Sequence, residues 1–183
     1  MEHATTSSLE AGLDQVRGAP SDRGPVELIV RRPSVLEREV VDEAVLDTDV
    51  GLVGDSWSQR PSSKMPDGSP HPKMQLTLMN ARAAQLFAGS RDRWALAGDQ
   101  LYVDLDISEA NLPAGTMITV GTAVVEITDQ PHTGCKKFGE RYGIDAARFV
   151  NAASTKGLRL RGVNARVVTS GVVRTGDVVR KLD

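Results

Sequence analysis

The segment Met117-Ile-Thr-Val-Gly-Thr-Ala-Val-Val-Glu-Ile-Thr128 indicates the fold more clearly than any other stretch of the chain. Its runs 117–120 and 123–128 are rich in β-branched residues, which favour strands. Between them, Gly121-Thr122 has the length and composition of a two-residue hairpin turn. The segment therefore predicts two antiparallel strands that are neighbours in a sheet.

Shorter segments of the same kind lie on both sides of this hairpin. Further strands are expected at 26–32, 38–46, 75–79, 101–105, 164–169, 172–173 and 178–182, and helices at 7–18, 81–88 and 145–152, with a helical turn over 91–97. Many short strands separated by glycine-containing turns, with few helices, favour an antiparallel barrel over a parallel βαβ sheet. We therefore expect a mainly β fold: a β-barrel with a few short peripheral helices.

The chain has the length of one domain, since its 183 residues suffice to bury a hydrophobic core. We expect residues 1–25 to form an N-terminal helix and linker, and residues 26–183 to form the barrel domain. Residues 58–73 are polar and contain four prolines. This composition predicts a loop that is mobile alone, or a lid that a ligand or a partner chain orders.

Charge and cysteine content argue against several classes of function. A net charge of −2 gives no general attraction to nucleic acid or anionic lipid, and no apolar run is long enough to span a membrane. One cysteine allows no internal disulfide, and residues 1–8 do not resemble a secretory signal. We therefore expect a soluble cytoplasmic protein. The sequence contains neither a glycine-rich phosphate loop of the NAD-binding type nor the ligand spacing of a zinc site.

Cys135 is the single cysteine and the sharpest chemical feature of the sequence. It lies in the segment Pro131-His-Thr-Gly-Cys-Lys-Lys137, which is polar and cationic. Cationic neighbours favour the thiolate, which is the reactive form of cysteine. Alternatively the thiol is buried and inert, as isolated cysteines commonly are. Residue types alone leave both readings open.

Positive residues follow the thiol in the sequence. Lys136 and Lys137 come directly after it, and Arg159 or Arg161 would create a pocket for an anion such as phosphate by folding back beside the loop. Asp55 and Asp99 each follow a glycine, so that turn hydrogen bonding explains both. Asn164 is equally compatible with a turn and with a ligand contact.

These residues resemble the MOSC domain, the family named for the C-terminal part of molybdenum cofactor sulfurase. The resemblance covers residues 26–182 and rests on short motifs that occur in a fixed order. They are Gly51-Leu-Val-Gly-Asp55, Gln75-Leu-Thr-Leu-Met79, Gly98-Asp-Gln-Leu101, Leu112-Pro-Ala-Gly115, Val125-Glu-Ile-Thr128, Cys135, Gly162-Val-Asn-Ala-Arg-Val167 and Gly176-Asp177.

The resemblance implies a barrel-like fold that binds the molybdenum cofactor, a molybdopterin. Cys135 stands at the position of the family's key cysteine, and is therefore expected to act as the catalytic thiol, either as a ligand of molybdenum or as the carrier of a persulfide sulfur. The residues expected to bind the cofactor are His132, Thr133, Lys136, Lys137, Arg161 and Asn164.

The resemblance also implies partners. It suggests a small-molecule substrate that is reduced or receives sulfur, and a desulfurase or redox partner protein. The alternative is a non-enzymatic carrier of sulfur or cofactor without bound metal. Pyridoxal phosphate is associated with the family through the desulfurase domain of the larger sulfurases, for which this chain has no room.

The chain departs from the family pattern at two positions. The family often has proline before the cysteine, where this chain has Gly134, which predicts a more flexible loop. Many members have a histidine soon after the first Gly-Asp, where Trp57 stands nearby.

Overall fold

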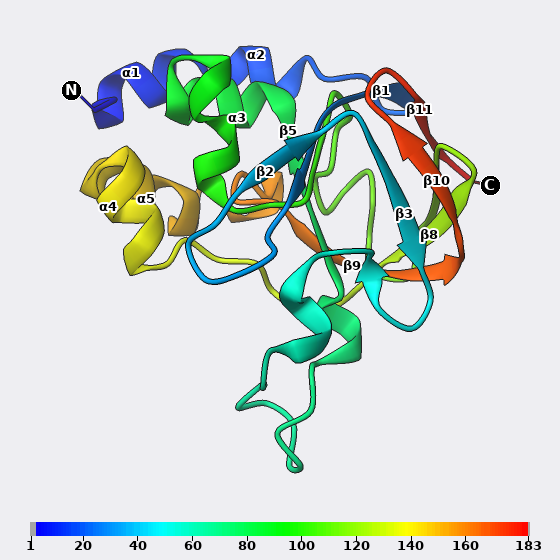
Figure 1. The fold of residues 1–183 in the computed structure, drawn as a ribbon. Helices are drawn as coiled ribbons and strands as arrows, with labels where there is room; N and C mark the ends of the chain where they lie inside the picture. Colours follow the sequence, from blue (N-terminus) through cyan, green and yellow to red (C-terminus); the bar gives the residue numbers. More distant parts are fainter. Residues whose placement is uncertain (1–2, 183) are drawn as a thin grey trace.

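The centre of the molecule is a closed barrel of seven strands (Figure 1) in a computed structural model that describes residues 3–182. The strand order around the barrel is β11-β7-β8-β9-β5-β6-β1, and β1 returns to β11. The pairs are antiparallel except for the parallel pair of β5 and β6. The strands are β1 (Arg23–Arg31), β5 (Leu76–Asn80), β6 (Leu101–Val103), β7 (Met117–Val120), β8 (Ala123–Ile127), β9 (Val163–Thr169) and β11 (Val178–Lys181). The predicted mainly β barrel is confirmed.

The hairpin predicted from the sequence is formed by β7 and β8. Its register pairs Met117 with Glu126 and Val120 with Ala123, which leaves Gly121-Thr122 as the two-residue turn. Alternate residues of both strands point into the barrel, where they join the larger of two hydrophobic clusters. The period of two in burial is what a sheet with one covered face requires.

The barrel closes through β1, which pairs with β6 on one side and β11 on the other. At the closure Gly24 lies opposite Val179. The segment that follows β6 also comes so close here that a Cβ on Gly24 would lie 1.7 Å from the carbonyl oxygen of Asp104. Only glycine allows this approach of two backbones.

A small second sheet lies beside the barrel. It consists of β3 (Glu43–Asp47), β4 (Gly51–Leu52) and β10 (Gly171–Arg174), in the order β10-β3-β4. The single strand expected at 38–46 is wrong, because the chain changes sheets at Asp42. The first part, β2 (Glu39–Val41), extends β1, and β3 pairs with β10.

The helices cover one side of the barrel (Figure 1). They are α1 (Thr6–Ala11), α2 (Leu13–Arg17), α3 (Ala81–Ala88), α4 (Lys136–Tyr142) and α5 (Ile144–Asn151), with 3-10 turns η1 (Ser56–Gln59), η2 (Pro72–Met74), η3 (Arg91–Ala97) and η4 (Lys156–Leu158). Apolar side chains from all five helices, from Leu9 to Phe149, join in the second hydrophobic cluster.

One predicted helix is divided in the structure, and one helix of the structure was not predicted. The helix expected at 7–18 is divided at Gly12, which caps the end of α1 and precedes α2. Helix α4 was not expected, because Gly139 interrupts its apolar pattern. Its buried residues Phe138 and Tyr142 are four positions apart and lie on one face. Helix α3 agrees with the prediction, including its Asn80 cap and Gly89 end.

The polar residues 58–73 project from the barrel as an extended loop (Figure 1). Within the described residues, no helix has the length and apolar character needed to cross a membrane.

We predict that Gly24→Ala destabilises the protein by about 3 kcal/mol or more, because the new methyl group has no space between two backbones. Urea unfolding followed by circular dichroism measures this loss. Gly157→Ala is the matched control, since a Cβ at Gly157 meets no atom within 4 Å. An unchanged urea midpoint for Gly24→Ala would contradict the close approach of Gly24 to the Asp104 carbonyl.

Candidate functional site

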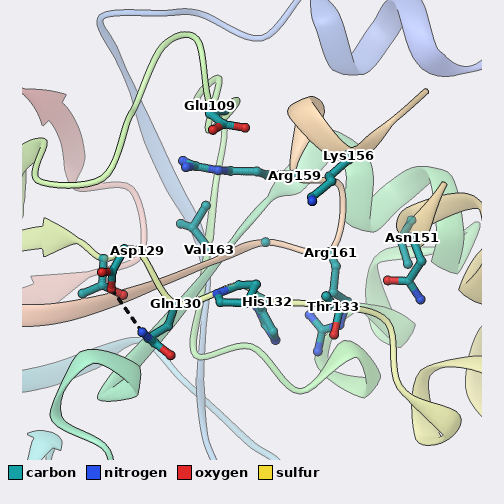
Figure 2. A pocket seen from close by; sticks show the side chains of 14 residues that line it. Glu109, Asp129, Gln130, His132, Thr133, Asn151, Lys156, Arg159, Arg161 and Val163 are labelled. Atoms are coloured by element: carbon teal, nitrogen blue, oxygen red, sulfur yellow. Dashed lines mark hydrogen bonds between the residues drawn. The ribbon is translucent and has the colours of Figure 1, made fainter. Parts of the chain in front are cut away.

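A cavity of about 610 Å³ opens between residues 128–133, the turn around η4, and the end of α5. Figure 2 shows its polar lining, in which the side chain of Arg159 extends beside Glu109. Lys156 is a second cation of the lining, and Thr133 and Asn151 contribute a hydroxyl and an amide. A cavity of this size and polarity can hold a small anionic molecule.

A buried ion pair forms the back of the cavity. Asp99 is fully buried, and its Oδ2 accepts a hydrogen bond from Nη1 of Arg161. Nη2 of Arg161 donates to the carbonyl oxygen of Ala97 at 2.8 Å. Nδ1 of His132 lies 3.4 Å from Oδ1 of Asp99, but this contact lacks hydrogen-bond geometry. Asp99 is therefore more than the turn residue that the sequence predicted.

Burial holds His132 in its neutral form. Loss of solvent contact and, to a smaller extent, the charge of Arg161 together lower the pKa of His132 to about 3, although Asp99 acts in the opposite direction. At neutral pH the ring therefore carries no charge. It cannot donate a proton as an imidazolium, nor can it stabilise a thiolate by its charge.

Cys135 is exposed and lies at the N-cap of α4. It lines a shallow groove between α4 and α5, which is separate from the cavity in Figure 2. Asn151 lines both depressions, so the groove that contains the thiol adjoins the cavity. The exposure of Cys135 contradicts the reading of a buried, inert cysteine.

The loop before Cys135 is fixed by Asn151. Its Oδ1 accepts a hydrogen bond from the Gly134 amide at 2.9 Å, and its Nδ2 donates to the Gly134 carbonyl at 3.0 Å. A Cβ at Gly134 would lie 2.5 Å from Cγ2 of Val150. Glycine is therefore required here for close packing, and the two hydrogen bonds oppose the flexibility that the sequence suggested.

The predicted cofactor-binding residues lie in three different parts of the structure. Thr133 and His132 line the cavity, together with the buried Arg161. Lys136 and Lys137 are exposed on α4, and Nζ of Lys136 lies 3.9 Å from Glu140. Asn164 is buried, and its Nδ2 donates to the carbonyl of Gln130 at 3.1 Å.

Sequence reasoning missed Lys156 and preferred Arg161 to Arg159. Arg161 is the cation already paired with a carboxylate, whereas Arg159 lines the cavity and its Nη1 donates to the carbonyl of Leu112. The positive φ of Arg159, 50°, which turns the chain after η4, has no signal in the local sequence. Asp55 does cap η1, as a turn residue was expected to do.

We predict that His132 makes stability depend on pH. In the unfolded chain the His132 ring is protonated near the ordinary histidine pKa of about 6.5, whereas in the folded protein it is protonated only at about 3. Because the unfolded state binds the extra proton between these values, the stability that the neutral ring contributes is lost as pH falls from about 6.5 to about 3. The difference in unfolding free energy between wild type and His132→Gln should therefore change by up to about 1.4 kcal/mol per pH unit over this range. Urea unfolding at several pH values measures it.

The control for this prediction is Gly157→Ala, because this substitution replaces no titratable group and a Cβ at Gly157 meets no atom within 4 Å. The difference in unfolding free energy between wild type and Gly157→Ala should be independent of pH. A pH-independent difference for His132→Gln would contradict a buried neutral ring.

The family model described as the MOSC domain matches residues 75–180. Comparison with functionally curated proteins gave no match.

Several solved structures share the fold. YiiM from Escherichia coli has 20% sequence identity and a TM-score of 0.57, and the match covers 88% of this chain and 70% of that one. YiiM from Geobacillus stearothermophilus has 14% identity and a TM-score of 0.60, with coverage of 88% and 75%. The YuaD protein from Bacillus subtilis has 15% identity and a TM-score of 0.56, with coverage of 86% and 94%. Since the family model spans more than half of the chain and the barrel agrees with these structures, this protein belongs to the MOSC domain family.

Proposed function

We propose that this protein binds the molybdenum cofactor, with the thiolate of Cys135 as its ligand to molybdenum. One observation carries the proposal: the only thiol of the chain is exposed in a groove that shares Asn151 with a polar cavity containing cationic side chains. The family to which the chain belongs is associated with this cofactor, which supports a common role of the thiol and the cationic groups in binding it.

The residues of the site fit the chemistry of such a cofactor. A pterin with a phosphate tail needs a cavity with polar walls and at least one cation, and Lys156, Arg159, Thr133 and Asn151 supply these groups. Molybdenum bound to sulfur is a soft centre, which a thiolate suits better than a carboxylate or an imidazole does. Lys136 and Lys137 add positive charge next to the thiol.

When bound, the cofactor would supply redox or sulfur-transfer chemistry. The chain's own residues would place it: Asn151 fixes the backbone before Cys135, and the pair of Asp99 and Arg161 supports the cavity from behind. His132 would contact the ligand as a neutral ring, because its pKa of about 3 keeps it uncharged. It would act as a binding group and not as an acid.

A second candidate is a sulfur carrier, and the position of the thiol favours it specifically. Cys135 is exposed and does not line the cavity itself. Its thiolate could attack the outer sulfur of a partner desulfurase's persulfide, so that this sulfur becomes bonded to Cys135 while the partner's cysteine leaves as a thiolate. The small-molecule substrate and the partner protein both remain proposals.

We predict that protein purified from a host that makes the cofactor contains molybdenum and pterin in stoichiometric amounts. Cys135→Ser should lose most of the molybdenum, because an alcohol is a poor ligand for a soft metal, and Arg159→Gln should lose pterin by weakening phosphate binding. Elemental analysis measures the molybdenum content, and fluorescence after oxidation measures the pterin content. Arg180→Gln is the control, since Arg180 is exposed on β11 and does not line the cavity.

Wild-type protein that contains neither metal nor pterin would contradict cofactor binding. The carrier would then be tested with a persulfide-loaded desulfurase and intact-mass spectrometry. One added sulfur in wild type, and none in Cys135→Ser, is the result expected for a carrier. An unmodified wild type would reject that role as well.

A further inference from the structure

Three arginines converge on Gly98, the residue before Asp99. Nη1 of Arg32 donates to the Gly98 carbonyl at 2.9 Å. A Cβ on Gly98 would lie 3.1 Å from Nη2 of Arg38 and 3.7 Å from Nη1 of Arg141. Gly98 has a φ of 88°, so glycine is favoured here by the backbone and is also required by the guanidinium groups above it.

A fourth arginine lies next to this group. Nε and Nη2 of Arg60 donate to Oγ of Ser56 at 2.9 and 2.6 Å, and this hydroxyl in turn donates to the carbonyl of Arg32. The four side chains come from the segment between β1 and β2, the segment after η1, and α4. The fold therefore brings distant parts of the sequence together around one turn.

Among these cations only Arg32 has a carboxylate partner within residues 3–182. Its guanidinium pairs with Asp55 through two hydrogen bonds, of 2.7 and 3.0 Å. Arg141 donates to the carbonyl of Leu96, and Arg38 to that of Glu37. Within these residues, Arg38, Arg60 and Arg141 therefore donate hydrogen bonds only to neutral acceptors. These acceptors satisfy N–H groups but do not neutralise the three positive charges.

Arg38 is the least satisfied of the group. Its Nε is buried and has no hydrogen-bond partner within the described part of the chain. Burial lowers the pKa of Arg38, and the charges of Arg141, Arg32 and Arg60 lower it further. Arg38, Arg60 and Arg141 are all half-buried, so each can still be reached from solvent. An anion that binds here would offset this repulsion and accept hydrogen bonds from the guanidinium N–H groups that solvent reaches.

We propose that Arg38, Arg60 and Arg141 form a binding site for a phosphate or sulfate group, which is separate from the cavity at Arg159 and from Cys135. The guanidinium forks match the oxygens of a tetrahedral oxyanion, and three of them favour a doubly charged one. The ligand is a free oxyanion or the phosphate group of a small phosphate ester. This proposal does not depend on cofactor binding.

Isothermal titration calorimetry of the full chain in phosphate-free buffer tests the site, with inorganic phosphate, sulfate and phenyl phosphate as probes. We expect saturable binding of at least one of them, and binding at least tenfold weaker in Arg38→Gln. Tighter binding of phenyl phosphate than of inorganic phosphate would identify an ester as the preferred form, and the reverse order a free oxyanion. Arg180→Gln is the matched control and should bind like wild type.

Two further measurements separate a binding role from a structural one. Without anion, Arg38→Gln should be at least as resistant to urea as wild type, because it removes a charge that its neighbours repel. Arg141→Gln provides a second variant, with the same tenfold loss of affinity. Cys135→Ser should bind phosphate like wild type, so failure of the cofactor proposal and failure of this one are distinguishable.

The proposal is overturned if wild type shows no saturable binding of any probe. It is also overturned if Arg38→Gln and Arg141→Gln both bind like wild type, or if Cys135→Ser alone removes binding.

Discussion

The buried ion pair of Asp99 and Arg161 is the interaction on which the candidate site depends. Two charges with almost no exposure are stable only together, since removal of one partner from such a pair costs about 3–5 kcal/mol. Arg161 lies two residues before β9, and its guanidinium carbon lies 5.1 Å from the ring centroid of Phe138 in α4. The pair therefore connects the barrel to the helix that begins after Cys135, and with it sets the position of the thiol.

This arrangement distributes positive charge in a way that the sequence around Cys135 does not suggest. Lys136 and Lys137 adjoin the thiol along the chain but extend from an exposed helix face. The cations that face depressions or one another, such as Arg159 and Arg38, come from segments far from the cysteine. In a barrel the loops at one end are brought together by strand order, so proximity in sequence is a poor guide to which charges act on a ligand.

The sequence was a good guide where a local rule decides the structure. The hairpin of β7 and β8 and the capped helix α3 follow from turn and capping chemistry within a few residues. The sequence was a poor guide where distant contacts decide. Asp99 was predicted to be a turn residue but forms a buried ion pair with Arg161, and Gly134 was predicted to loosen a loop that Asn151 holds in place. Both outcomes depend on partners that no local pattern identifies.

Closure of the barrel between β1 and β11 has a consequence for how the protein folds. The pairing of Gly24 with Val179 joins residues from nearly opposite ends of the chain, and contacts of such high sequence separation slow folding. During synthesis β1 must wait, with one edge unpaired, until β11 has left the ribosome. Unpaired strand edges can associate with other chains. Folding yield should therefore be more sensitive to protein concentration and to the rate of synthesis than the stability of the closed barrel would suggest.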